Sequence, residues 1–200
     1  MRLRKRKWVD PLINSDDKFI INNTFSYDNF ILEIGMGMGD FIIESAKLNP
    51  NIQYIGLEKD RTCVGKVIRR LQSENIENLK ILLADATNLN ELVKDNTVNH
   101  LYLHFSDPWP KKHYHKRRLT YPSYLKMYER ILKSDGLLTF KTDNVDLFND
   151  TLEYIKESNF EVVELDRDYH KVKREEALTA YENKFKDQGI HINYLLLRKQ

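Results

Sequence analysis

The chain has 200 residues, of which 41% are hydrophobic, 11% aromatic and 31% charged, and its formal net charge is +2. This length and balance predict one domain, residues 1–200, around a single buried core. Cys63 is the only cysteine, which excludes an internal disulfide and a cysteine-built metal site, and we expect no metal. We expect a cytoplasmic protein without membrane contact, because no apolar stretch approaches the ~20 residues of a membrane span and none follows the basic start as in a signal peptide.

Positive charge is concentrated in two segments, although the total is nearly balanced. Residues 2–7 hold five basic side chains, and residues 111–118 hold five more together with two histidines. A nucleic-acid partner must therefore be argued from where the charge lies and not from its sum. We expect residues 1–10 to form a flexible basic arm.

Apolar runs alternate with stretches of helical spacing along the chain. The apolar runs predict strands over residues 30–34, 52–57, 79–83, 98–105, 137–141, 160–165 and 191–197. The helical spacing predicts helices over residues 39–48, 61–72, 121–132, 145–157 and 177–186. This order predicts an α/β fold: a mostly parallel seven-stranded sheet with helices on both faces and one late strand antiparallel at an edge.

An acidic residue follows or ends each of the first five predicted strands. These residues are Glu33, Glu58, Asp85, Asp107 and Asp143. In an open α/β sheet, ligands bind beyond the carboxyl ends of the strands, where the strand order reverses. One such acid alone would be an ordinary surface cap, but five at corresponding positions predict a binding site.

A glycine-rich turn joins the first of these strands to the first of these helices. Gly35 and Gly37 allow a tight turn and a close approach of a ligand to the backbone. The dinucleotide fingerprint requires its third glycine one place later, where this chain has Asp40, and a carboxylate there disfavours a pyrophosphate. S-adenosylmethionine, which has no phosphate and carries positive charge, suits the turn better than a dinucleotide. A plain strand-to-helix turn is the alternative.

Two acids beyond this turn are placed to bind the rest of such a cofactor. Glu58 can accept hydrogen bonds from both ribose hydroxyls, as an acid at this position does in dinucleotide folds. Asp85, followed by Ala86, can bind the adenine amino group through its carboxylate.

The loop after the fourth predicted strand combines an acid, two prolines, an aromatic ring and positive charge. Asp107 begins it, and Trp109 lies between the prolines, where it either stacks on a base or packs beneath the loop. The basic residues 111–118 either contact phosphates or form a solvated surface. Asp143 has two interpretations also, as a pocket residue or as the cap of the helix predicted after it.

The loop and several shorter motifs resemble the bacterial tRNA (guanine-N7-)-methyltransferases from about residue 30 to the C-terminus. These motifs are Asp-Pro-Trp-Pro-Lys-Lys at 107–112, His-Lys-Arg-Arg at 115–118, Leu-Glu-Ile-Gly at 32–35, Gly-Leu-Glu at 56–58, Asp-Ala at 85–86, Phe-Lys-Thr-Asp-Asn at 140–144 and Thr-Ala-Tyr-Glu at 179–182. The loop motif is specific, whereas many methyltransferases share the glycine turn.

The resemblance implies a Rossmann-like class I methyltransferase that uses S-adenosylmethionine to methylate guanine 46 in the variable loop of tRNA. The residues implied for the cofactor are Glu33, Gly35, Gly37, Glu58, Asp85, Ala86 and Asp107, and those implied for the substrate are Lys111, Asp143, Thr179, Ala180, Tyr181 and Glu182. We expect RNA contacts from His113, Tyr114, His115, Lys116, Arg117 and Arg118.

Guanine N7 has a lone pair and no proton, so methyl transfer requires positioning more than a general base. We assign Asp107 as the catalytic residue, with Asp143 as an alternative and Glu182 in reserve, because a carboxylate stabilises the positive charge that develops on the purine.

Three rival functions stay open at this stage: methylation of another nucleic-acid or protein nitrogen, a nucleotide-dependent oxidoreductase, and a non-catalytic RNA-binding protein. A monomer and a homodimer are both compatible with the sequence.

Overall fold

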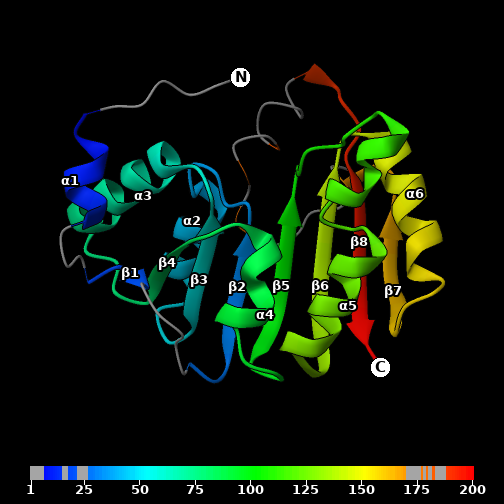
Figure 1. Ribbon diagram of the computed structural model, residues 1–200, viewed down its shortest axis with the longest axis horizontal. Coiled ribbons are helices and arrows are strands. Elements are labelled where there is room, and N and C mark those ends of the chain that lie inside the picture. The colour runs from blue at the N-terminus through cyan, green and yellow to red at the C-terminus, as the bar shows by residue number, and fades with distance from the viewer. Residues whose placement is uncertain are drawn as a thin grey trace.

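The structure, a computed structural model, describes residues 7–14, 18–21, 27–169, 177, 179, 182 and 188–200. Its described part is built on one eight-stranded sheet in the order β1-β4-β3-β2-β5-β6-β8-β7 (Figure 1). The strands are β1 (Ile20–Ile21), β2 (Phe30–Ile34), β3 (Gln53–Glu58), β4 (Leu79–Leu83), β5 (Val98–His104), β6 (Leu132–Thr142), β7 (Phe160–Asp166) and β8 (Asn193–Lys199). Strand β1 was not predicted, because two residues are too few to show a periodicity.

The antiparallel pairing expected at one edge of the sheet is made by β8. This strand runs antiparallel to both of its neighbours and lies between β6 and the edge strand β7. The strands from β1 to β6 pair in parallel. Strand β6 begins at Leu132, earlier than the expected 137, and contains an irregular stretch around Asp135, whose φ is 62°.

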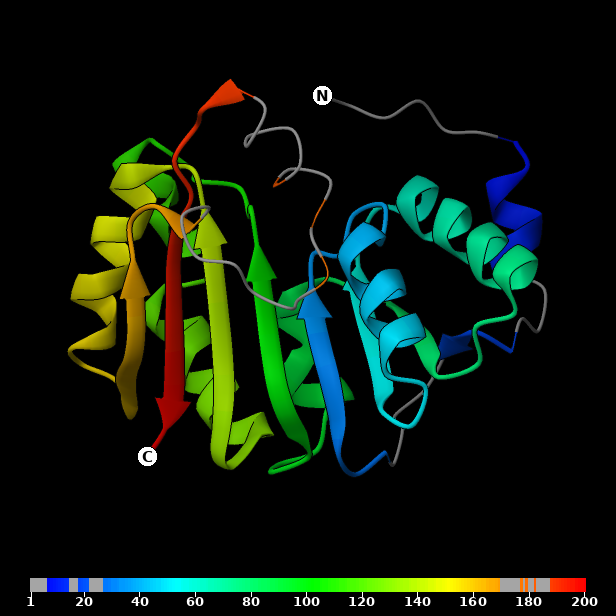
Figure 2. The same ribbon diagram turned by 180° about the vertical axis from the view of Figure 1, so that it is seen from behind.

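Helices cover the sheet on both faces, as predicted. They are α1 (Val9–Asn14), α2 (Asp40–Leu48), α3 (Arg61–Glu74), α4 (Leu89–Leu92), α5 (Pro122–Ile131) and α6 (Val145–Ile155), with 3₁₀ helices η1 (Ala86–Asn88) and η2 (Lys112–Arg117). Helices α4, α5 and α6 pack on one face, and α1, α2 and α3 share a separate apolar core on the other (Figures 1 and 2). The helix predicted over 177–186 falls mainly outside the described residues. No helix in the described ranges is both long and apolar enough to cross a membrane.

Residues 8–14 pack against α3, although a flexible arm was expected over residues 1–10. Val9 begins α1 and is buried, and Trp8 lies over the guanidinium of Arg69 in α3, with 3.4 Å between the ring centre and the guanidinium carbon. The two helices approach closely, since a Cβ on Gly65 would meet the Trp8 and Val9 side chains at 3.2–3.3 Å. Residues 1–6 lie outside the described part, so a basic arm extends at most to the residues before α1.

Helix ends place the loops that carry polar residues at the carboxyl edge of the sheet. The Asp60 carboxylate accepts hydrogen bonds from the Thr62 and Cys63 amides at 2.8 and 3.0 Å, so α3 starts after only two residues that follow β3. Asn144 caps α6 in the same way through the Leu147 amide. Strand order reverses between β2 and β5, because β3 lies on one side of β2 and β5 on the other. A ligand site is expected at this point of the sheet.

Candidate active site

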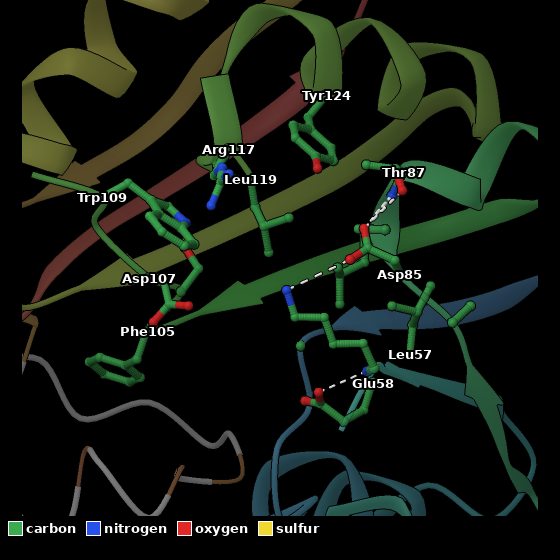
Figure 3. Close-up of a pocket in the computed structure, with 16 residues that line it drawn as sticks. Leu57, Glu58, Asp85, Thr87, Phe105, Asp107, Trp109, Arg117, Leu119 and Tyr124 are labelled. Carbon is green, nitrogen blue, oxygen red and sulfur yellow. Dashed lines mark hydrogen bonds and ion pairs between the residues drawn. The ribbon is translucent and has the colours of Figure 1, made fainter. Parts of the chain in front are cut away.

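A cavity of about 500 Å³ opens at the carboxyl ends of β2, β3, β4 and β5, where the strand order reverses. This volume lies in the usual range for a small-molecule site. Glu58 and Asp85 lie on one side of it, and Asp107 and Trp109 lie across from them (Figure 3). The structure therefore brings three of the five predicted acids into one pocket.

The glycine turn reaches this cavity through Gly35, whereas Gly37, also predicted to bind the cofactor, is not among the lining residues. Gly35, Gly37 and Gly39 have φ values of 75°, 56° and 74°, a left-handed conformation that side chains with a Cβ rarely adopt. A Cβ on Gly39 would also lie 3.0 Å from the Val67 side chain. The Asp40 carboxylate is paired with Arg70 at 2.6 Å, so its charge is balanced on the α3 side. The charge of Asp40 therefore disfavours a bound pyrophosphate less than the sequence indicated.

Backbone amides fix the Glu58 carboxylate in the pocket wall. One oxygen accepts from the Gly37 amide at 3.0 Å, and the other accepts from the Lys59 and Asp60 amides, each at 2.8 Å. This arrangement joins the glycine turn to the end of β3. A carboxylate held in this way can accept a bidentate pair of hydroxyl donors without rearrangement.

Asp85 faces the same cavity from the end of β4. Its carboxylate accepts from the amide and hydroxyl of Thr87 at 3.0 and 2.9 Å, and Lys59 lies 3.7 Å away. The hydrogen bond from the Thr87 amide, with further help from the Thr87 hydroxyl and Lys59, lowers the pKa of Asp85. Ala86, the next residue, is buried in the cavity lining and begins η1.

Glu33 lies on the opposite face of the sheet from this cavity. Side chains alternate along β2, so Ile34 lines the cavity while Glu33 points toward α2. The Glu33 carboxylate is 3.1 Å from Nδ1 of His104, whose ring packs edge-on against Phe41 of α2. Burial raises the pKa of Glu33 well above its ordinary value. The structure thus separates Glu33 from the acids that it was grouped with.

A buried polar cluster extends from this pair to the end of β6. The ammonium group of Lys141 is fully buried and donates to the Tyr169 hydroxyl and the Glu182 carboxylate, each at 2.9 Å. The other Glu182 oxygen accepts from the Thr179 amide at 2.7 Å, and the Thr179 hydroxyl accepts from the Glu182 amide at 3.0 Å. This reciprocal pair of hydrogen bonds is a capping box. Ala180 and Tyr181, also predicted to bind substrate, lie outside the described residues.

Burial keeps two histidines of the same strand face neutral. His100 donates to or accepts from the Thr139 hydroxyl at 2.8 Å and stacks on Tyr102. Burial, with a smaller effect of the Lys141 charge, lowers the pKa of His100 to about 4 and that of His104 well below its ordinary value.

These two pKa shifts predict a loss of stability in acid. Below about pH 6.5 the unfolded chain binds protons that the folded protein excludes, so the free energy of unfolding falls as the pH drops from about 6.5 toward 4. The His100 contribution is up to about 3 kcal/mol over this window. Urea unfolding of His100→Gln should therefore show a flatter pH dependence than the wild type, whereas the exposed control His113→Gln should match it. The wild type alone does not isolate the histidines, because the raised pKa of Glu33 makes the free energy of unfolding change with pH in the opposite direction. The comparison of the variants isolates the His100 contribution. Parallel curves for wild type and His100→Gln would contradict the assignment.

The loop after β5 holds two aromatic residues in an unusual backbone conformation. Phe105 and Trp109 have φ values of 49° and 42°, which bulky side chains seldom adopt outside functional sites. Trp109 lines the cavity, makes an edge contact with Tyr114 and lies 5.0 Å from the Arg117 guanidinium (Figure 3). It is therefore a wall of the pocket and is not packed beneath the loop. The Ser106 hydroxyl in the same wall is buried without a hydrogen-bond partner among the described residues.

The basic segment after this loop divides into exposed and buried side chains. Most of it forms η2, in which Lys112, His113, Lys116 and Arg117 are exposed, while Tyr114 and His115 are half-buried. Arg118 is only 2% exposed. The predicted RNA contact of Arg118 is therefore wrong, because its guanidinium is bonded inside the protein and cannot reach a phosphate.

The remaining predicted substrate residues, Lys111 and Asp143, are exposed and are not among the residues that line the cavity. Lys111 is exposed directly before η2. Asp143 is exposed at the end of β6, and Asn144 caps α6. The interpretation of Asp143 as that cap is therefore wrong, and its place in the pocket stays a prediction.

Several residues of the site were not predicted from the sequence. Leu119 and Tyr124 line the cavity, and so does Arg117, for which only an RNA contact was expected. Tyr124 belongs to α5, whose spacing looks like that of any core helix. His100 and His104 alternate with apolar residues along β5, and this alternation could have indicated a shared polar face.

The fold is that of the class I methyltransferases. The structure superimposes on the crystal structure of the 16S rRNA methyltransferase KamB with a TM-score of 0.65 at 14% identity, covering 87% of this chain and 89% of that one. Residues 28–195 match the family model described as putative methyltransferase. The chain is 35% identical to the tRNA (guanine-N(7)-)-methyltransferase of Macrococcus caseolyticus over 99% of this chain and 100% of that protein. It is 41% identical to the enzyme of the same name from Mycoplasmopsis agalactiae over 100% of this chain and 99% of that protein. The chain belongs to the family of tRNA (guanine-N7-)-methyltransferases.

Proposed function

We propose that this protein transfers the methyl group of S-adenosylmethionine to N7 of guanine 46 in the variable loop of tRNA. The single observation that carries the proposal is the pocket at the sheet's switch point, which joins Glu58, Asp85 and Asp107 and opens beside the basic η2. The full-length similarity to enzymes named for guanine-N7 methylation of tRNA supports the substrate. Such a reaction belongs to the cytoplasm, where tRNA is processed.

The donor groups of the pocket fit the proposed cofactor. Glu58 is fixed to accept from a ribose diol, Asp85 is ionised and can accept from an adenine amino group, and the buried Ser106 hydroxyl has an unused hydrogen-bonding capacity. Gly35 lies in the lining, where the backbone leaves room for a ligand. When bound, S-adenosylmethionine supplies an electrophilic methyl group on a sulfonium.

The residues of the chain orient the base and offset its charge. Trp109 presents a ring on which a purine can stack, a contact worth about 1–3 kcal/mol. Asp107 lies on the same side of the cavity and can accept from the Watson–Crick edge of guanine as positive charge builds on the ring. The exposed cations of η2 can neutralise phosphates next to the base.

The proposed function is tested by mapping the methylated nucleoside. A tRNA transcript with guanine 46 should gain 7-methylguanosine at that position when incubated with the protein and labelled cofactor, whereas a transcript with adenine 46 should gain none. DNA and a mixture of proteins serve as competing substrates. Label in DNA or protein but not in tRNA would contradict the proposal, and so would cofactor binding without any transfer.

Replacing Glu58 should weaken cofactor binding. Glu58→Gln keeps the shape of the side chain but loses the charge that the ribose hydroxyls would meet, so we expect affinity to fall by about 1.5–3 kcal/mol, or roughly 10- to 100-fold. Calorimetric titration with S-adenosylhomocysteine measures this directly. Glu77→Gln, an exposed residue remote from the pocket, is the control. Equal affinities for both variants and the wild type would remove Glu58 from the site.

Neutralising exposed cations of η2 should weaken tRNA binding in a salt-dependent way. Because each phosphate contact releases counterions, Lys112→Ala combined with Lys116→Ala should reduce the slope of log affinity against log salt by up to about 2. Filter binding of tRNA over a salt series measures the slope, with Lys126→Ala on α5 as the control. A slope equal to that of the wild type would mean that these side chains are only solvated.

A further inference from the structure

Arg118 is an arginine buried at the centre of the loop region that carries the proposed site. Its Nε donates to the Pro108 carbonyl at 2.7 Å, and one terminal nitrogen lies 2.9 Å from Nε2 of His115. The other terminal nitrogen pairs with the Asp150 carboxylate of α6. An arginine only donates, so His115 is the acceptor in this contact, through Nε2. One rigid guanidinium therefore joins the loop, η2 and a helix of the fold.

The bond to Pro108 acts on the strained part of the loop. The Pro108 carbonyl belongs to the peptide that precedes Trp109, and Trp109 has the unfavourable φ of 42°. A backbone in such a conformation persists only where surrounding contacts hold it. Arg118 supplies such a contact, at the peptide that directly precedes Trp109.

The guanidinium of Arg118 is bonded to a helix that packs into the hydrophobic core. Asp150 lies in α6, which packs Leu147 and Phe148 into the core. The segment after Arg118 is tied to the same helix, because the hydroxyls of Thr120 and Thr151 are 2.7 Å apart and both residues are buried. The loop is thus positioned relative to the core by α6, through Arg118.

We propose that Arg118 is a positioning residue, which holds the loop carrying Asp107 and Trp109 in its reactive shape instead of contacting RNA. This inference rests on the proposed function, because the loop matters only if a base is presented to it. It gives different roles to residues of the same basic segment, 111–118. Lys116 is exposed, whereas Arg118 faces inward.

The inference predicts a separation of turnover from binding. Arg118→Lys keeps the charge but cannot bond to three partners at once, so the loop loses its fixed geometry. We expect kcat to fall by about 10- to 100-fold, as for other small misplacements of reacting groups, while the KM for tRNA stays within about threefold. The salt slope of tRNA binding should equal that of the wild type, unlike the slope of the Lys112 and Lys116 double variant.

A second readout does not require turnover. In a Trp8→Phe background, Trp109 is the remaining tryptophan, so its fluorescence reports on the loop. Arg118→Lys should increase quenching of Trp109 by acrylamide and shift its emission to the red. Asp150→Asn leaves Arg118 in place but removes its support, and it should change the fluorescence in the same direction. Its effect should not add to that of Arg118→Lys.

The matched control is Arg130→Lys. Arg130 also bonds backbone carbonyls, those of Leu89 and Val93, but it lies at the far end of α5 from the cavity. It should lower the urea midpoint without changing kcat or Trp109 quenching, which separates positioning from plain stability. A normal kcat with a reduced salt slope in Arg118→Lys would overturn the inference in favour of an RNA contact. Unchanged quenching would overturn it as well. Failure of the proposed function would appear differently, as absence of methyl transfer to tRNA by the wild type.

Discussion

Replacing Asp107 by alanine should lower the rate of methyl transfer by about 100- to 1,000-fold, the usual effect of removing one preorganised charge-stabilising group. Asp107 lies in the cavity wall on the side of Trp109, at the end of β5 where the strand order reverses. Positive charge develops on guanine as N7 is alkylated, and a carboxylate that faces the ring stabilises this state more than the ground state. The effect therefore falls on kcat.

The measurement is a single-turnover assay with saturating cofactor and tRNA, together with tRNA binding by filter retention. Binding should stay within about twofold, because a lone carboxylate contributes no phosphate contact. Asp107→Asn distinguishes charge from shape and should be nearly as slow as Asp107→Ala. Asp28→Ala, an exposed acid before the amino end of β2, is the matched control. A near-normal rate at saturation with weakened binding of S-adenosylhomocysteine would make Asp107 a cofactor ligand only and would refute its catalytic role.

The sequence predicts the strands that carry this site, because apolar periodicity and the order of the strands along the chain can be read directly from it. The runs at 30–34 and 79–83 are the observed β2 and β4, and the acids after three of the strands meet at one cavity. Parallel strands bring their carboxyl ends to the same edge whatever their spatial order. The position of Glu58 and Asp85 therefore follows from chain order alone.

The sequence cannot give the face on which a polar side chain lies when both faces are buried. Glu33 occurs in a run without polar alternation, and only the register of β2 against β5 turns it toward His104. The same holds for Arg118, which looks like its exposed neighbours until the fold supplies Pro108 and Asp150 as partners. Long-range partners decide these cases.

Replacing Lys141 by methionine should lower the free energy of unfolding by about 3–5 kcal/mol, the cost of leaving a buried partner charge uncompensated. The Lys141 ammonium group is completely buried, and its bond to Glu182 links the end of β6 to the capping box with Thr179. Its charge also lowers the cost of placing Glu33 in the same interior, since it opposes the effect of burial on the pKa of Glu33. The loss therefore arises from electrostatics in the interior, because both side chains are completely buried and an unpaired charge there is costly.

Urea unfolding measures the change, with the exposed Lys126→Met as the control. The combination of Lys141→Met with Glu182→Gln removes both charges, so it should be clearly more stable than Lys141→Met alone. Methionine fills most of the volume of lysine, which keeps the cavity contribution small. A loss below about 1 kcal/mol for Lys141→Met, or a double variant no more stable than the single one, would show that the pair does not hold this segment against the sheet. The recovery in the double variant is the decisive measurement, because a packing defect would persist in it and an unpaired buried charge would not.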